Sequence, residues 1–130
     1  MAKKWVVMSI ITLLIVSLCV LESNYIQDSF EFLLDNLNVI EMNISVDGDI
    51  NTVGNIKALN DLHEQWRNKT KYLKMIVWHT GMKEVEINLS RIQSYVEINN
   101  QEEALVELHA LQDFSRHYKD DFTITIENIL

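Results

Sequence analysis

A long stretch without any charged residue, from Trp5 to Leu21, restricts what this chain can fold into more than any other feature. As a helix rising about 1.5 Å per residue, it would be about 26 Å long, close to the roughly 30 Å thickness of a bilayer's hydrocarbon core. Trp5 is of a residue type that prefers the membrane interface. We therefore expect residues 1–21 to form a cytoplasmic stub and a transmembrane signal anchor, and residues 22–130 to form a separate domain.

Two alternatives to an uncleaved anchor remain open. A cleaved signal peptide would have a shorter apolar region and small residues before its cleavage site, and the sequence has neither before Glu22. A lipoprotein signal would use Cys19, but the bulky Leu18 precedes it and the apolar residues continue to Leu21. The sequence favours the retained anchor over both.

The charges on the two sides of this stretch predict its orientation. Lys3 and Lys4 precede it, whereas Glu22 and Asp28 follow it, and positively charged flanks generally stay in the cytoplasm. We therefore expect a single-pass protein of the cytoplasmic membrane, with its N-terminus inside and residues 22–130 outside. The only cysteine, Cys19, lies within the anchor, so the exported domain has no disulfide and must be stabilised by packing alone.

The domain after the anchor is strongly acidic. The whole chain has a formal net charge of −8, and leaving out Lys3 and Lys4 gives −10 for the remainder. No basic stripe is available to neutralise phosphates, so we expect no nucleic-acid partner. The negative charge also disfavours a domain that lies flat on anionic lipid.

The remainder predicts an all-α fold, because the chain has only three glycines and no proline and its apolar residues recur at helical spacing. We expect about four amphipathic helices, joined by short links into an antiparallel bundle or a pair of helical hairpins. No glycine or proline follows Leu21 directly, so the membrane helix can run on into the first of them. The inward positions of the first two helices are Ile26, Phe30, Leu33, Leu37, Ile40 and Ile44, followed by Ile56, Leu59, Leu62, Trp66, Leu73, Ile76 and Val77.

Turn and capping signals predict where these helices begin and end. The Asp47-Gly48 turn ends the first helix, and Asp49 or Asn51 is placed to cap the second. The second helix is expected to run without a break to Gly81, which suits a left-handed C-terminal cap.

The third helix is predicted from Lys83 to Ile98, and Asn99 breaks it. Asn100 followed by Glu103 is a capping-box pattern that starts the fourth helix. The tail 122–126 alternates apolar residues with threonine, which predicts an extended segment folding back over the bundle. The inward positions of the last two helices are Val85, Leu89, Ile92 and Val96, followed by Ala104, Leu105, Leu108, Leu111 and Tyr118.

A set of short features occurs in order from Trp66 to the C-terminus: Trp66, His79 with Glu84-Val85-Glu86, Ala104-Leu105 with Leu108, His117, and the closing Asn128-Ile129-Leu130. In these features the chain resembles the domain-of-unknown-function 4363 family, whose bacterial members join a short membrane anchor to a small helical domain. Gly54 departs from the pattern, because an alanine is expected near the start of the second helix. The resemblance implies the architecture, and it implies no activity or catalytic residues.

Four histidines, His63, His79, His109 and His117, are the candidate metal ligands of the exported domain. Their spacing does not support a metal site, because no Cys/His pair stands at zinc spacing and no Glu-x-x-His occurs. We expect His79 and His117 to bond to a helix end or a neighbouring side chain, with His79 in the last turn of its helix, where a cation is favoured. The sequence therefore predicts no metal site and no cofactor.

Catalytic patterns are also lacking. The sequence has no Gly-rich phosphate loop and no Gly-x-Ser-x-Gly elbow. Glu84 and Glu86 would point to different sides of a helix, so they do not form a carboxylate pair for acid–base chemistry. We therefore expect no catalytic residues and no enzyme.

Two functions of different classes are consistent with these patterns. The first is a membrane-anchored interaction or accessory module, held in the bilayer through residues 5–21, that contacts another membrane protein. The alternative is an extracytoplasmic sensor that binds a small molecule between the helices near His79 and His117.

Overall fold

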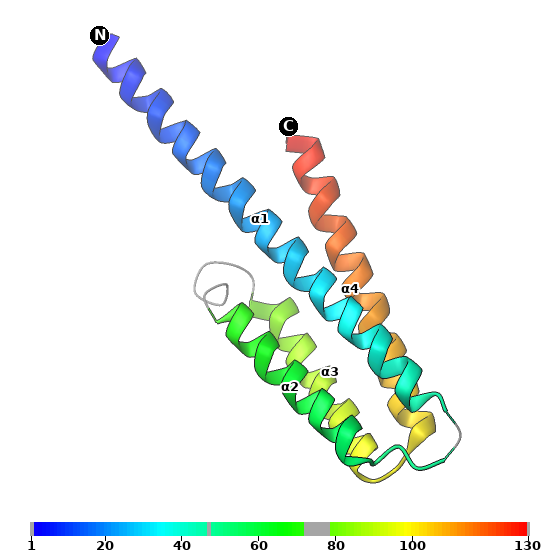
Figure 1. Ribbon diagram of the computed structural model, residues 1–130. Helices are drawn as coiled ribbons and strands as arrows, with labels where there is room; N and C mark the ends of the chain where they lie inside the picture. The colour runs from blue at the N-terminus through cyan, green and yellow to red at the C-terminus, as the bar shows by residue number, and fades with distance from the viewer. Residues whose placement is uncertain (1, 47, 72–78, 130) are drawn as a thin grey trace.

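The computed structural model describes residues 2–46, 48–71 and 79–129, and in these ranges it contains helices joined by links and no strands (Figure 1). The four helices are α1 (Ala2–Ile44), α2 (Val53–Thr70), α3 (His79–Glu97) and α4 (Gln101–Ile129). Successive helices run antiparallel, and α1 packs against both α2 and α4 while α3 packs against the same two. The predicted all-α fold with an N-terminal apolar helix and a helical bundle is confirmed.

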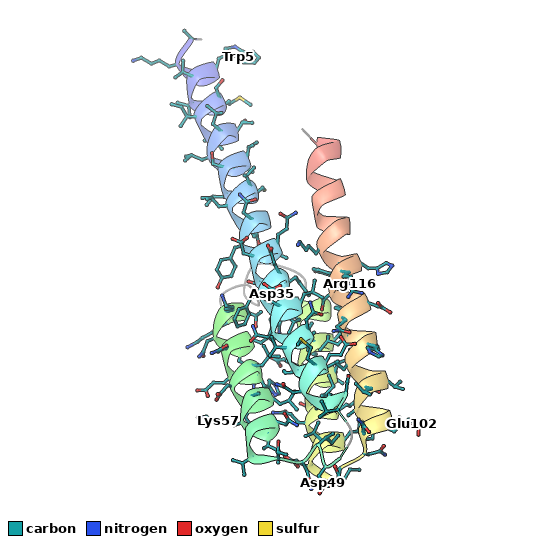
Figure 2. The ribbon with its side chains drawn as sticks, turned by 45° about the vertical axis from the view of Figure 1, so that its right-hand side comes forward. Trp5, Asp35, Asp49, Lys57, Glu102 and Arg116 are labelled. Carbon is teal, nitrogen blue, oxygen red and sulfur yellow. The ribbon has the colours of Figure 1, made fainter. Side chains whose placement is uncertain are left out.

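The first helix is one unbroken element that contains both the predicted anchor and the first helix of the bundle. Its N-terminal half projects beyond the other helices, with Trp5 at one end of the molecule and Asp49 at the other (Figure 2). At about 1.5 Å per residue, its 43 residues span about 64 Å. The predicted membrane helix therefore runs on into the first helix of the bundle without a break, as the sequence allowed.

The core is formed by the apolar stripes that the sequence predicted. Phe30 and Trp66 meet edge to face, with ring centroids 5.2 Å apart. The inward positions of all four helices are buried or packed against the core wherever the structure describes them. Leu73, Ile76 and Val77 lie outside the described residues. The fully or nearly fully buried apolar residues are Ile26, Phe30, Leu33, Leu37, Ile40, Ile44, Ile50, Leu59, Leu62, Trp66, Met82, Val85, Leu89, Ile92, Val96, Ala104, Leu108 and Leu111.

The links at the end of the bundle far from Trp5 are held by specific caps. Asn99 adopts the left-handed conformation, with φ of 60°, and the bonds Asn99 N to Val96 O and Asn100 N to Tyr95 O close α3 in a Schellman motif. The Asn100 side chain accepts from the Glu103 amide at 3.2 Å, as its N-cap position predicted. The second helix is capped by Thr52, which accepts from the Asn55 amide, so the prediction of Asp49 or Asn51 as the cap is wrong.

The predicted long second helix is wrong, because α2 ends at Thr70 and α3 already begins at His79. Gly81 lies inside α3 and is no left-handed cap. An added Cβ at Gly81 would stand 2.8 Å from Cε2 of Tyr118, so the missing side chain lets α3 approach α4 closely. His79 consequently lies in the first turn of α3 and not in the last turn of the preceding helix.

The prediction of an extended tail at residues 122–126 is also wrong, because α4 continues to Ile129. Phe122, Ile126 and Ile129 recur at intervals of four and three residues, which fits a helix as well as alternation fits a strand. No glycine or proline interrupts the sequence after Asn100. The helix therefore has no local reason to stop.

Candidate functional site

The apolar half of α1 has no protein contacts that cover it. Its large apolar side chains between Trp5 and Leu21 are 44% to 72% exposed, apart from Val20, which is half-buried, and no residue in the most apolar window of the helix is buried. Within the part of the chain that the structure describes, α1 is the one helix long and apolar enough to cross a membrane. An apolar surface of this size in a soluble protein marks a membrane or protein contact.

The structure separates the predicted candidate histidines. His109 Nε2 lies 3.0 Å from Oε1 of Glu41 on α1, and His117 Nδ1 lies 2.8 Å from the Asp113 carbonyl oxygen in its own helix. His63 is buried between α2 and α3. The side chain of His79 lies outside the described residues. Among the described side chains, no three of His, Cys, Asp and Glu stand close enough together to hold a metal ion.

Polar side chains link α1 to α4 beside the core. Gln112 Nε2 donates to Oε2 of Glu41 at 2.8 Å and to Oδ1 of Asn38 at 3.0 Å. The pKa of Glu41 lies below its ordinary value, first because Gln112 donates to the carboxylate and then because His109 does. A carboxylate only accepts, so His109 Nε2 carries the hydrogen in this contact.

A groove between α2 and α3 has a volume of about 550 Å³. It opens to solvent and is lined by His63, Arg67, Lys83, Glu86, Ile87, Ser90, Arg91, Ser94 and Tyr95. The sequence did not predict it. Small-molecule sites typically have volumes of about 300 to 1,000 Å³, so the groove is large enough for a small ligand.

One sequence signal for part of this groove exists at His63. It follows Leu59 by four residues and precedes Trp66 by three, which places it on the buried face of α2. A histidine on a buried helical face requires polar partners. The sequence gives no such signal for Arg67, Lys83 and Arg91. Each of them falls on the polar face of its own helix, which the sequence predicts to be exposed to solvent.

The far end of the bundle carries a second group of exposed apolar residues. They come from the end of α1 and the link after it, the start of α2, the link after α3 and the start of α4. Figure 1 places these segments together at the end opposite the N-terminus. We call them the distal apolar residues: Val39, Met42, Val46, Val53, Ile98 and Val106, each 56% to 85% exposed.

Comparisons with known proteins place the chain in a family without giving it an activity. Neither the curated proteins nor the solved structures contain a match to this chain. The model of one family, described as a domain of unknown function (DUF4363), matches residues 20–129. This range runs from the last residues of the apolar stretch through the whole bundle. The chain therefore belongs to the DUF4363 family.

Proposed function

We propose that this protein is a non-enzymatic accessory module of the cytoplasmic membrane, anchored by residues 5–21, whose bundle contacts the extracytoplasmic part of another membrane protein. The unbroken α1 carries this proposal. No flexible link separates the exposed apolar half from the bundle, and the bundle starts within one turn of Leu21, where the Tyr25 hydroxyl donates to the Lys69 carbonyl oxygen at 2.6 Å. Such an anchor holds the bundle at a fixed height and orientation.

We propose that the distal apolar residues take part in this protein contact. From Leu21 to Ile44 the helix rises about 35 Å, so these residues stand about that far above the proposed bilayer. Several exposed apolar side chains at one end of an otherwise acidic domain are more typical of a protein interface than of a solvated surface. The partner we propose must therefore extend about 35 Å out of the membrane.

Site-specific photocrosslinking in intact membranes tests this contact. A photoreactive residue in place of Met42 or Val106 should capture one membrane protein, whereas the same residue in place of the exposed Asp113, nearer the middle of α4, should not. Met42→Glu should remove the capture without changing the melting temperature. Equal capture from Asp113, or none from the two distal positions, would contradict the proposal.

The rigid coupling between the anchor and the bundle can be tested by inserting a flexible linker. A Gly/Ser linker inserted after Ser23 behaves as a flexible coil, so it should reduce partner capture while the stability of the bundle stays the same. Capture that survives a long insertion would show that the anchor is only a tether.

The topology of the protein is tested by labelling. An impermeant thiol reagent should label a Ser94→Cys variant in intact cells. Labelling only after lysis would place the bundle in the cytoplasm.

Ligand sensing is the second candidate function, and the groove between α2 and α3 is the observation that favours it. The sequence placed a ligand near His79 and His117, but His117 is exposed on α4 and bonds to its own helix. His63 lines the groove instead. A sensor would couple occupation of this groove to the orientation of α1, because α2 packs directly against α1.

A further inference from the structure

The groove between α2 and α3 concentrates positive charge in an acidic domain. Arg67 comes from α2, and Lys83 and Arg91 come from α3, with Glu86 as the one carboxylate among the lining residues that the structure describes. Within the ranges that the structure describes, none of these three cations forms an ion pair or a side-chain hydrogen bond. Like charges placed together repel each other, so a bound anion would stabilise this arrangement.

His63 adds a second, independent feature, a buried polar atom without a partner. Its side chain is only 7% exposed, and its Nδ1 lies 3.0 Å from Oε1 of Gln93. The Gln93 amide is oriented by its own bond, in which Nε2 donates to Oδ1 of Asn60 at 2.7 Å. Since Oε1 can only accept, His63 Nδ1 carries the hydrogen in this contact, and in the tautomer with its hydrogen on Nδ1 the other ring nitrogen, Nε2, is an acceptor.

This acceptor is left unsatisfied by the residues that the structure describes. A buried polar atom without a partner costs about 1 to 3 kcal/mol. Because His63 is one of the residues that line the groove, a ligand that reaches this atom and donates a hydrogen bond would remove that cost. The hydroxyls of Ser90 and Ser94 do not supply it, because they donate to the carbonyl oxygens of Glu86 and Ser90.

We propose that this groove binds a phosphate group, with Arg67, Lys83 and Arg91 holding its oxygens and its hydroxyl donating to Nε2 of His63. Arginine and lysine side chains bind both carboxylates and phosphates. An ionised carboxylate only accepts hydrogen bonds, whereas hydrogen phosphate and singly protonated phosphomonoesters also donate one. The combination of cations with a buried acceptor therefore favours phosphate over carboxylate. This site does not depend on the proposed protein partner.

Two sources could supply the phosphate. One is a soluble phosphate or phosphomonoester, and the other is the phosphomonoester headgroup of a lipid. The contact of Tyr25 with Lys69 places the C-terminal end of α2 near the height at which α1 leaves the proposed bilayer, so Arg67 is within reach of a headgroup as well as of solution.

Titration of the full chain in a phosphate-free sugar detergent distinguishes these cases. The probes are inorganic phosphate, inorganic sulfate and phosphatidic acid mixed into the micelles, followed by calorimetry and by the ¹⁵N resonances of the arginine side chains. We expect saturable binding of phosphate, of phosphatidic acid, or of both, with shifts at Arg67 and Arg91. Sulfate, which has the same shape but no hydroxyl at neutral pH, should bind about tenfold more weakly or worse.

Variants with matched controls complete the test. Arg67→Gln, Arg91→Gln and Lys83→Gln should each weaken binding by about tenfold or more, as expected for the loss of a charge-assisted hydrogen bond. Arg116→Gln on α4 and Lys57→Gln at an exposed position of α2 remove the same charges outside the groove and should leave the affinity unchanged (Figure 2). Arg67→Lys serves if a glutamine variant fails to fold, and it should bind more weakly than the native chain.

Three results would overturn the proposal. The first is unsaturable binding of both phosphate probes. The second is an equal loss of affinity in the groove variants and in the two controls, which would indicate general electrostatic attraction. The third is equal affinity for sulfate and phosphate, which would remove the role of His63 and with it the preference for phosphate. Binding of phosphatidic acid alone would support the proposal and identify a lipid headgroup as the source.

Discussion

The two halves of α1 share one continuous helix and have opposite surfaces. Between Trp5 and Leu21 nearly all of the large apolar side chains are exposed, whereas further along the helix one stripe of apolar residues is buried against the other helices. This stripe consists of Ile26, Phe30, Leu33, Leu37, Ile40 and Ile44. Charged residues make the difference, because residues 5–21 include none, whereas the second half has Asp28, Glu31, Asp35 and Glu41 between its apolar positions. An all-round apolar surface suits lipid, and a stripe suits a protein core. The environment of each half can therefore be tested separately.

Truncation of a leucine to alanine should lower the free energy of unfolding only in the bundle half of α1. This is the largest effect that we expect. Leu33 is fully buried and Leu13 is 66% exposed. Leu33→Ala should lower the free energy of unfolding of the bundle by about 2 to 5 kcal/mol, because it removes buried methyl groups and leaves a cavity. Leu13→Ala should leave it unchanged. Urea denaturation of the full chain in a mild detergent, followed by near-ultraviolet circular dichroism, measures both, and similar costs would show that the two halves pack alike.

Insertion of a charge should affect only the anchor half. Leu13→Lys places a charge near the middle of the proposed membrane span, which costs about 2.5 to 3.5 kcal/mol in membrane insertion. Val39→Lys introduces the same charge at an exposed position of the bundle and should have no effect. The measurement is the fraction of protein that stays with membranes after an alkaline carbonate wash. Full retention of the Leu13→Lys variant would argue against a membrane span.

Substitution of the two helical glycines, Gly54 and Gly81, should have smaller effects on stability, and these effects test how closely the helices pack in the bundle. Gly54→Ala places its Cβ in open space and should stabilise the protein by up to about 1 kcal/mol through helix propensity. Gly81→Ala would force the Tyr118 ring away, and this ring packs against Phe30 and Phe114. We expect a net loss of about 1 kcal/mol, since overpacking outweighs the gain in propensity.

The same denaturation assay compares these two variants. In a Tyr118→Leu background the ring is absent, so Gly81→Ala should become neutral or stabilising. A destabilising effect that persists in that background would show that the ring is not the obstacle.

The smallest expected effect concerns Glu41 and pH. Its pKa in the folded protein lies below the ordinary value of 4.5, so the stability it contributes is present above that value and is lost as the pH falls through the folded pKa. Glu41→Gln should therefore lower the melting temperature near neutral pH and have less effect below about pH 4. The cost should stay below about 1 kcal/mol because the contact is exposed. Gln112→Ala removes the main donor and should reduce this pH dependence, and an unchanged dependence would contradict its role.

Helical spacing predicted most of the core, although the buried Ile50 and Met82 were not among the predicted inward positions. The stripe on α1 and the inward positions Val85, Leu89, Ile92 and Val96 are confirmed as buried, because a helix that buries one face shows this in its own sequence. The end of α2 was mispredicted for a related reason. No glycine or proline marks the chain between Thr70 and His79, and apolar residues at helical spacing continue through it, so the pattern concealed the break.

Gly81 and the groove between α2 and α3 both depend on contacts between different helices, which the sequence around each residue does not predict. The requirement for glycine at position 81 comes from Tyr118 on another helix, a contact far along the chain. In the same way, Arg67 and Arg91 form one groove only because α2 lies beside α3. Periodicity gives the orientation of each helix about its own axis, and it leaves open which polar faces will meet.

The return of α4 alongside α1 fixes where the last turn of the chain ends. His109 lies beside Glu41 and Lys119 lies beside Glu31, and continuing this register brings Ile129 to the height of Leu21, where α1 enters the proposed bilayer. A fluorescent reporter fused after α4 would therefore lie against the lipid headgroups. One inserted at Gly48 would stand about 35 Å away. Energy transfer from a lipid dye to these two reporters would then measure the tilt of the bundle in a living membrane.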